Sequence, residues 1–196
     1  MYEISVENTE AKNKITLPAL LSISVTKLFM KLIDITDFCL STNGLKPVIE
    51  HVYVFKKDGK LFTAATDAFK LIEVFYDTDN KDYMYDFPDG FYSIDKWKKI
   101  AKEWNTKTPK LLKIDNLVKE NTAIVEISGD FPDYDRLFTG DRIPVTNQSF
   151  STKDFSLFIK KIGDTFSFSD LRSLGENKPI VYEKDNIRML IMPANL

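Results

Sequence analysis

Hydrophobic and polar residues recur along this chain with the periods of strands and helices, and their positions predict a succession of short elements. Residues 52–55 form one apolar run, residues 61–65 form the next, and residues 57–60 between them contain an Asp-Gly pair. An Asp-Gly pair tolerates the positive φ angles of a tight turn. The two runs are therefore predicted to be the strands of a hairpin.

Three segments have the spacing of an amphipathic helix. The first spans residues 26–40. The second begins after Ser93, a residue suited to an N-cap, and places Trp97 and Trp104 on one side. The third begins at residue 151 or 152 and places Phe158 inward. Short strands are expected around these helices at residues 16–25, 111–114, 122–127, 179–182 and 188–192. This recurrence, roughly every 55 to 65 residues, predicts an α+β fold of repeated helix-plus-antiparallel-strand units.

Composition and charge narrow the class of protein. The 15 Phe, the 8 Tyr and a hydrophobic content of 43% are typical of a folded domain. The net charge of -2 gives no overall attraction to DNA, so a DNA-binding role requires cations gathered on one surface. Residues 1–10 lack the apolar run of a signal peptide, and the chain has no stretch of about 18 apolar residues. We therefore expect a cytoplasmic protein without a membrane partner.

Few residues suit catalysis or metal binding. Cys39, the only cysteine, ends an apolar stretch and is expected to be buried and unreactive. His51, the only histidine, lies near no serine or cysteine motif and is expected to be structural. Asp130, Asp133 and Asp135 could hold a divalent cation, but Asp residues beside a proline more often form a turn. We therefore expect no enzyme, no catalytic residue, no metal site and no cofactor.

Three short segments occur in the order found in a known family. Residues 66–71 read Thr-Asp-Ala-Phe-Lys-Leu, residues 131–134 read Phe-Pro-Asp-Tyr, and residues 192–196 read Met-Pro-Ala-Asn-Leu. Together they resemble the T-D-x-x-[RK]-L, F-P-D-Y and M-P-x-x-L segments of the bacterial sliding clamp, the beta subunit of DNA polymerase III. The resemblance implies the DNA-clamp fold, in which helices line a central channel and sheets lie outside.

The resemblance also implies a division into domains. Residues 1–140 resemble the middle domain of the family, and residues 141–196 resemble only the second half of its last domain. A lone half-domain leaves an unpaired sheet edge and an uncovered apolar helix face, which proteins normally cover. We therefore expect either a homo-oligomer or a half-domain that folds back onto the first domain.

A peptide-binding pocket is the best-supported site. In the family, partner proteins insert a short apolar and aromatic peptide between the T-D-x-x-[RK]-L loop and the C-terminal strand. Here Ala68, Phe69 and Lys70 stand where Gly, His and Arg are common, which could change partner preference. Without the resemblance, the residues alone favour the simpler interpretation that both segments are sheet core and a strand end. The expected pocket comprises Thr66, Ala68, Phe69, Lys70, Leu71, Met192, Pro193, Ala194, Asn195 and Leu196.

Lysines gather on two of the predicted helices. Residues 93–107 hold five positive and two negative residues, a balance of +3 in a chain of -2. Such segregation suits contact with a phosphate backbone irrespective of base sequence. Lysine-rich faces are also common on ordinary solvated helices, so that alternative stays open. The expected DNA-facing set is Lys96, Lys98, Lys99, Lys102, Lys153, Lys160 and Lys161.

Two functions follow from these features. The first is a sliding-clamp-like DNA replication processivity factor that binds DNA polymerase or other clamp-binding proteins and encircles DNA as a homo-oligomer. The second is a non-ring adaptor or decoy that captures clamp-binding peptides. The missing half-domain favours the adaptor, and the lysine-rich helices favour the ring. The molecular mass in solution separates them, because a strict monomer cannot close a ring.

Overall fold

The computed structural model describes residues 31–41, 46–77, 87–106, 124–125, 127–145, 148–162, 167–175 and 178–194. The predicted strands at residues 16–25 and 111–114 lie outside these ranges, as do Asn195 and Leu196. The described strands are β1 (Val52–Lys57), β2 (Lys60–Thr66), β3 (Lys70–Asp77), β4 (Gly90–Tyr92), β5 (Ile124–Val125), β6 (Ile143–Pro144), β7 (Leu171–Ser173), β8 (Ile180–Lys184) and β9 (Ile187–Ile191). The helices are α3 (Ile94–Thr106) and α5 (Thr152–Ile162), with 3-10 turns η1 (Thr36–Phe38), η2 (Pro47–Ile49), η4 (Asp135–Phe138) and η5 (Phe168–Asp170).

All the described strands belong to one antiparallel sheet with the order β5-β4-β1-β2-β3-β9-β8-β7-β6. The predicted β1–β2 hairpin is confirmed, and its turn residue Asp58 has the expected positive φ of 51°. Strand β3 pairs with β9 from Lys70 opposite Ile191 to Val74 opposite Ile187. The sheet therefore joins an early segment of the chain to the late one.

Helix α3 begins after Ser93, as predicted, and buries the side that its spacing indicated. The backbone N–H of Trp97 donates to the carbonyl of Ser93 at 2.9 Å. Trp97 is fully buried and Trp104 is 2% exposed. The ring of Trp97 lies 5.8 Å from that of Tyr92 and 6.3 Å from that of Phe87. These aromatic contacts hold α3 against the β4 side of the sheet.

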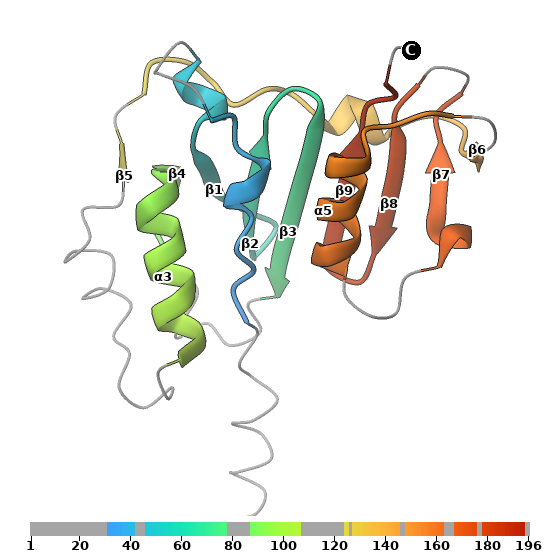
Figure 1. Ribbon diagram of the computed structural model, residues 1–196. Coiled ribbons are helices and arrows are strands. Elements are labelled where there is room, and N and C mark those ends of the chain that lie inside the picture. Colours follow the sequence, from blue (N-terminus) through green and yellow to red (C-terminus); the bar gives the residue numbers. More distant parts are fainter. Residues whose placement is uncertain are drawn as a thin grey trace, which may run out of the picture. The chain divides into compact units, whose positions relative to one another are not determined.

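Helix α5 is likewise confirmed and packs through its apolar side. Phe158 is fully buried and meets the ring of Tyr182 edge-on at 5.8 Å. In the strand register, Tyr182 lies opposite Met189, which lies opposite Ile72 on the same face of the sheet. Both α-helices cover this face (Figure 1), whereas η4 packs against part of the other face.

The predicted helix at residues 26–40 is wrong for its described part. Residues 32–41 contain only the η1 turn. The carboxylate of Asp34 accepts hydrogen bonds from the backbone N–H of Thr36 at 3.1 Å and from its hydroxyl at 2.6 Å. The amide side chain of Asn105 bonds to both backbone groups of Leu32, at 3.1 and 2.8 Å. These side chains satisfy backbone groups that a helix would pair internally.

Three strand predictions match the structure only in part, among them residues 179–182, which overlap β8. The predicted strand at residues 188–192 is β9, which ends at Ile191. Residues 122–127 contain β5, of which the structure describes only two residues. Among the described residues, no helix is both long enough and apolar enough to cross a membrane.

Candidate functional site

The turn between β2 and β3 is fixed by its own side chains. The hydroxyl of Thr66 donates to the carbonyl of Lys70 at 2.7 Å and accepts from the N–H of Ala68 at 3.1 Å. The carboxylate of Asp67 accepts from the N–H groups of Phe69 and Lys70, both at 2.9 Å. Ala68 adopts a φ of 78°, a region that glycine occupies more easily. This turn holds Phe69 outward with 68% of its surface exposed.

The end of β9 lies directly beside this turn. The backbone N–H of Met192 donates to the carbonyl of Phe69 at 2.8 Å, continuing the ladder in which Leu71 lies opposite Leu190. The N–H of Ala194 then donates to the carbonyl of Ser149 at 2.8 Å. The structure thus places the two predicted pocket segments side by side, up to Ala194.

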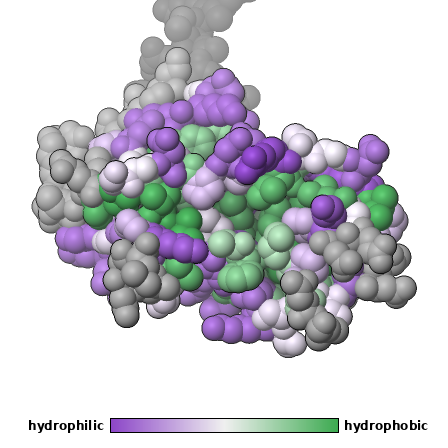
Figure 2. Space-filling model, turned by 90° about the horizontal axis from the view of Figure 1, so that it is seen from above, coloured by the Kyte–Doolittle hydropathy of each residue, from purple (hydrophilic) through white to green (hydrophobic). Residues whose placement is uncertain are grey.

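A buried apolar cluster contains Leu71, which follows the turn, and Leu190 of β9. Phe131 and Leu174 pack against this cluster, which with them draws on residues 64–71, 131–138, 174 and 181–190. Three exposed apolar side chains stand on the elements that meet here: Phe69 at 68%, Leu137 of η4 at 38% and Met192 at 38%. Figure 2 looks onto this end of the sheet and shows apolar surface interrupted by hydrophilic residues. The buried members are Ala64, Leu71, Tyr134, Phe138, Val181 and Leu190.

Lys70 faces away from this apolar cluster. It alternates with Leu71 along β3, so its side chain lies on the face covered by α5. Its ammonium group pairs with Asp67 and, at 3.0 Å, with Asp154 of α5. Burial alone would lower the pKa of Lys70, but its hydrogen bonds to Asp67 and Asp154 raise it above its usual range. Lys70 therefore ties the turn to α5.

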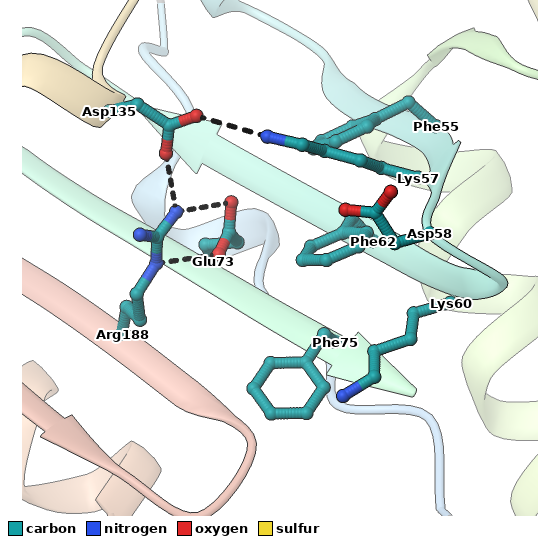
Figure 3. Close-up of a pocket in the computed structure, with 9 residues that line it drawn as sticks. All are labelled: Phe55, Lys57, Asp58, Lys60, Phe62, Glu73, Phe75, Asp135 and Arg188. Atoms are coloured by element: carbon teal, nitrogen blue, oxygen red, sulfur yellow. Dashed lines mark hydrogen bonds and ion pairs between the residues drawn. The ribbon is translucent and has the colours of Figure 1, made fainter. Parts of the chain in front are cut away.

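An ionic network around the buried carboxylate of Glu73 fixes η4 on the sheet. Glu73 of β3 is 2% exposed and receives two hydrogen bonds from Arg188 of β9, at 2.7 and 3.0 Å. The hydroxyl of Tyr134 also donates to Glu73. Arg188 in addition reaches Asp135 at 2.7 Å (Figure 3). Arg188 lowers the pKa of Asp135, and Lys57 adds to the effect at 3.6 Å. No pattern in the sequence had indicated this network.

The predicted DNA-facing lysines have three different surroundings. Lys98 of α3 lines one cavity of about 710 Å3 together with Lys153 and Lys160 of α5. Lys161 is instead bonded to the carbonyl of Asp34 and pairs with Asp37 at 3.3 Å. On α3, Lys99 and Lys102 are exposed, whereas Lys96 is half-buried.

The described residues include few side chains suited to catalysis or to metal binding. Burial, reinforced by Asp34 and Asp37, raises the pKa of Cys39 to about 12, which agrees with the expected unreactive thiol. The Nδ1–H of His51 donates to the carbonyl of Pro47 at 2.7 Å, a structural contact. The described part of the chain holds no group of three or more His, Cys, Asp or Glu placed to bind a metal ion.

Solved structures similar to this chain are bacterial sliding clamps. A Pseudomonas aeruginosa DNA polymerase sliding clamp with a ligand gives a TM-score of 0.59 at 14% identity, covering 88% of this chain and 64% of the clamp. The P. aeruginosa DNA polymerase III subunit beta gives 0.58 at 13% identity, with coverages of 88% and 64%. The Bacillus subtilis sliding clamp gives 0.51 at 14% identity, with coverages of 87% and 63%.

This chain therefore spans less than two thirds of the length of these clamps. No protein-family model matches the chain, and a sequence search of curated proteins found no match. In this chain the matched architecture is one antiparallel sheet with helices on one face. The chain has an α+β fold that matches the sliding-clamp fold.

Proposed function

We propose that this chain is a sliding-clamp-like replication factor that binds short peptides of DNA polymerase or other clamp-binding proteins, and that it performs no chemical step. The observation that carries the proposal is the hydrogen bond from Met192 to Phe69 beside the β3–β9 ladder, because it brings two segments far apart in sequence into one surface. Three apolar side chains are exposed next to the buried apolar cluster, namely Phe69, Leu137 and Met192. They can contact the apolar side chains of a peptide, and the flexible Met side chain can adjust to different partners.

Loss of an apolar anchor is expected to weaken peptide binding. Met192→Ala and Leu137→Ala should each reduce affinity for a labelled peptide carrying Leu and Phe side chains by about 1 to 3 kcal/mol. Fluorescence anisotropy measures this, and Ile143→Ala is the control, because Ile143 is 47% exposed but lies on β6. Equal affinity of all three variants and the unaltered protein would contradict the proposed site.

The helix face is proposed to approach DNA. Lys98, Lys153 and Lys160 line one cavity from two helices. The cavity is also lined by Asp37, Asp67 and Asp154, but these carboxylates pair with Lys161 and Lys70, so the three lysines can meet a phosphate backbone. The pair Lys98→Glu with Lys160→Glu is expected to weaken DNA association and to lower the salt slope by about 1 for each lysine that had touched a phosphate. A matched control, Lys46→Glu with Lys178→Glu, changes the charge equally away from α3 and α5. A salt slope that falls equally in both pairs would show that only net charge matters.

A non-ring adaptor or decoy is the second candidate function. The observation that favours it is that the β2–β3 turn and the end of β9 belong to the same chain, so peptide capture at this surface needs no second copy. Light scattering at several protein concentrations distinguishes the candidates. A ring requires several copies per particle, whereas an adaptor that binds the peptide stays at the mass of one chain, 22.6 kDa.

A further inference from the structure

The face of the sheet opposite the helices carries a row of aromatic side chains. Tyr53 and Phe55 of β1 point to this face together with Phe62 and Phe75, since Phe62 lies opposite both Phe55 and Phe75 in the strand register. Consecutive rings lie 5.1, 5.0 and 6.0 Å apart, and all four side chains are half-buried. Open faces of antiparallel sheets normally carry polar residues, so a continuous, partly exposed aromatic row indicates an interaction surface.

One end of the row opens into a cavity of about 230 Å3. Tyr53 and Phe55 line it with Phe91 and Phe131, whose rings each lie 5.1 Å from the ring of Tyr53. A neighbouring hollow of about 280 Å3 shares Phe55 and continues over the rest of the row (Figure 3). The two hollows share Phe55 and Asp135, and the second is also lined by the cations Lys57, Lys60 and Arg188.

The cavity is acidic on one side. Asp130, Asp133 and Asp135 line it, and the cations of the ionic network around Glu73 already neutralise Asp135. Asp130 and Asp133 are exposed and form no ion pair with any other residue that the structure describes. Burial raises the pKa of Tyr53, and the negative charges of Asp89 and Asp130 raise it further. A negative potential therefore acts directly beside the aromatic rings.

We propose that this aromatic face docks a basic segment of a partner protein, with an arginine side chain entering the cavity beside Asp130 and Asp133. A guanidinium group stacks on aromatic rings and pairs with carboxylates through its planar fork, so it satisfies both features of the cavity. Single-stranded nucleic acid also stacks on aromatic rows, but its phosphates need a cationic surround. Among the described residues, no cation lines the cavity beside Asp130 and Asp133, and its carboxylates repel phosphates, although Lys57 and Lys60 line the neighbouring hollow. The inference is independent of the peptide site at Phe69, Leu137 and Met192.

Titration of the full chain with a labelled acetyl-Gly-Arg-Gly-Arg-Gly peptide tests this surface. The matched ligands are the same peptide with citrulline in place of arginine, which keeps the shape but removes the charge, and a labelled oligo-dT. The test variant is Asp130→Asn with Asp133→Asn, and the control is Asp141→Asn with Asp185→Asn, which changes the net charge equally on other exposed turns. Tyr53→Leu removes the ring that contacts Phe55, Phe91 and Phe131 in the cavity and keeps an apolar residue on β1. Circular dichroism establishes that each variant is folded.

The arginine peptide is expected to bind the unaltered chain and the control variant with the same affinity. Binding to the Asp130 and Asp133 variant should fall about fivefold or more, and binding to Tyr53→Leu about threefold. The citrulline peptide should bind the unaltered chain as weakly as the arginine peptide binds the Asp130 and Asp133 variant. The proposal is overturned if citrulline and arginine peptides bind equally, if both Asn pairs lose affinity equally, or if oligo-dT binds more tightly than the arginine peptide.

Discussion

Replacement of Arg188 by Met is expected to lower the free energy of unfolding by about 2 to 4 kcal/mol, because it leaves the carboxylate of Glu73 buried without its cation. Glu73 is only 2% exposed, and the remaining hydrogen bond from Tyr134 supplies no positive charge. This loss of unfolding free energy is smaller than that for a fully buried ion pair, because the side chain of Arg188 is 26% exposed. The same change also releases Asp135 and thereby loosens η4 from the sheet.

Urea unfolding at neutral pH measures this loss. Lys184→Met is the matched control, since it removes the more exposed pair with Asp170 and should cost no more than about 1 kcal/mol. Adding Glu73→Gln to Arg188→Met should recover part of the stability, because it removes the unpaired buried charge. A loss no larger than that of Lys184→Met would show that the network does not hold the two strands together.

The penalty of Arg188→Met should shrink in acid. Arg188 holds the pKa of Asp135 below its ordinary value of 3.8 in the folded protein. A group with a lowered folded-state pKa stabilises the fold above its unfolded-state pKa, and this stabilisation is lost as the pH falls through the folded-state value. The unaltered protein therefore loses this contribution in acid, whereas the variant has none to lose.

Lys70→Met is expected to have a comparable effect on stability, about 2 to 4 kcal/mol, because it leaves two carboxylates facing one another without a cation. The side chains involved are largely buried, with exposures of 9% for Lys70, 14% for Asp67 and 21% for Asp154. This pair of contacts joins the β2–β3 turn to α5. The pKa of Lys70 is raised, so its contribution is complete below the unfolded-state pKa and is lost only as the pH rises through the higher folded-state value.

Thermal unfolding and peptide titration together test the role of Lys70. Lys153→Met, an exposed position on the same helix as Asp154, should change stability by no more than about 0.5 kcal/mol. At temperatures where Lys70→Met remains folded, it should bind the Leu- and Phe-containing peptide far better than Met192→Ala does. Unchanged stability together with abolished peptide binding would place Lys70 in the pocket wall and contradict the tie to α5.

Local patterns in the sequence predicted the elements that depend on local spacing. Trp97 and Trp104 mark α3 through their helical period, Phe158 marks the inward side of α5, and the Asp-Gly pair marks the first hairpin. Pairing between β3 and β9 left no such signal, because the partners Glu73 and Arg188 are 115 positions apart. The predicted first helix failed because side chains of other residues, among them Asn105 of α3, bind its backbone groups.

The candidate site was only partly visible in the sequence. The resemblance located the β2–β3 turn and the end of β9, and the structure places them side by side. Alternation along β3 could have shown that Lys70 and Leu71 face opposite sides, a signal that the prediction of the pocket did not use. Leu137 and the network around Glu73 could not be assigned, because their roles depend on where η4 lies on the sheet.

The most direct test of the peptide-binding surface is a titration of methyl-labelled methionine followed by NMR. Met192 is 38% exposed at the proposed surface, whereas Met189 of the same strand region is fully buried and serves as an internal control. Addition of the Leu- and Phe-containing peptide is expected to shift and saturate the Met192 methyl resonance while that of Met189 moves little, and a peptide with Ser at both positions should leave both in place. A peptide that binds the chain without moving the Met192 resonance would contradict the account.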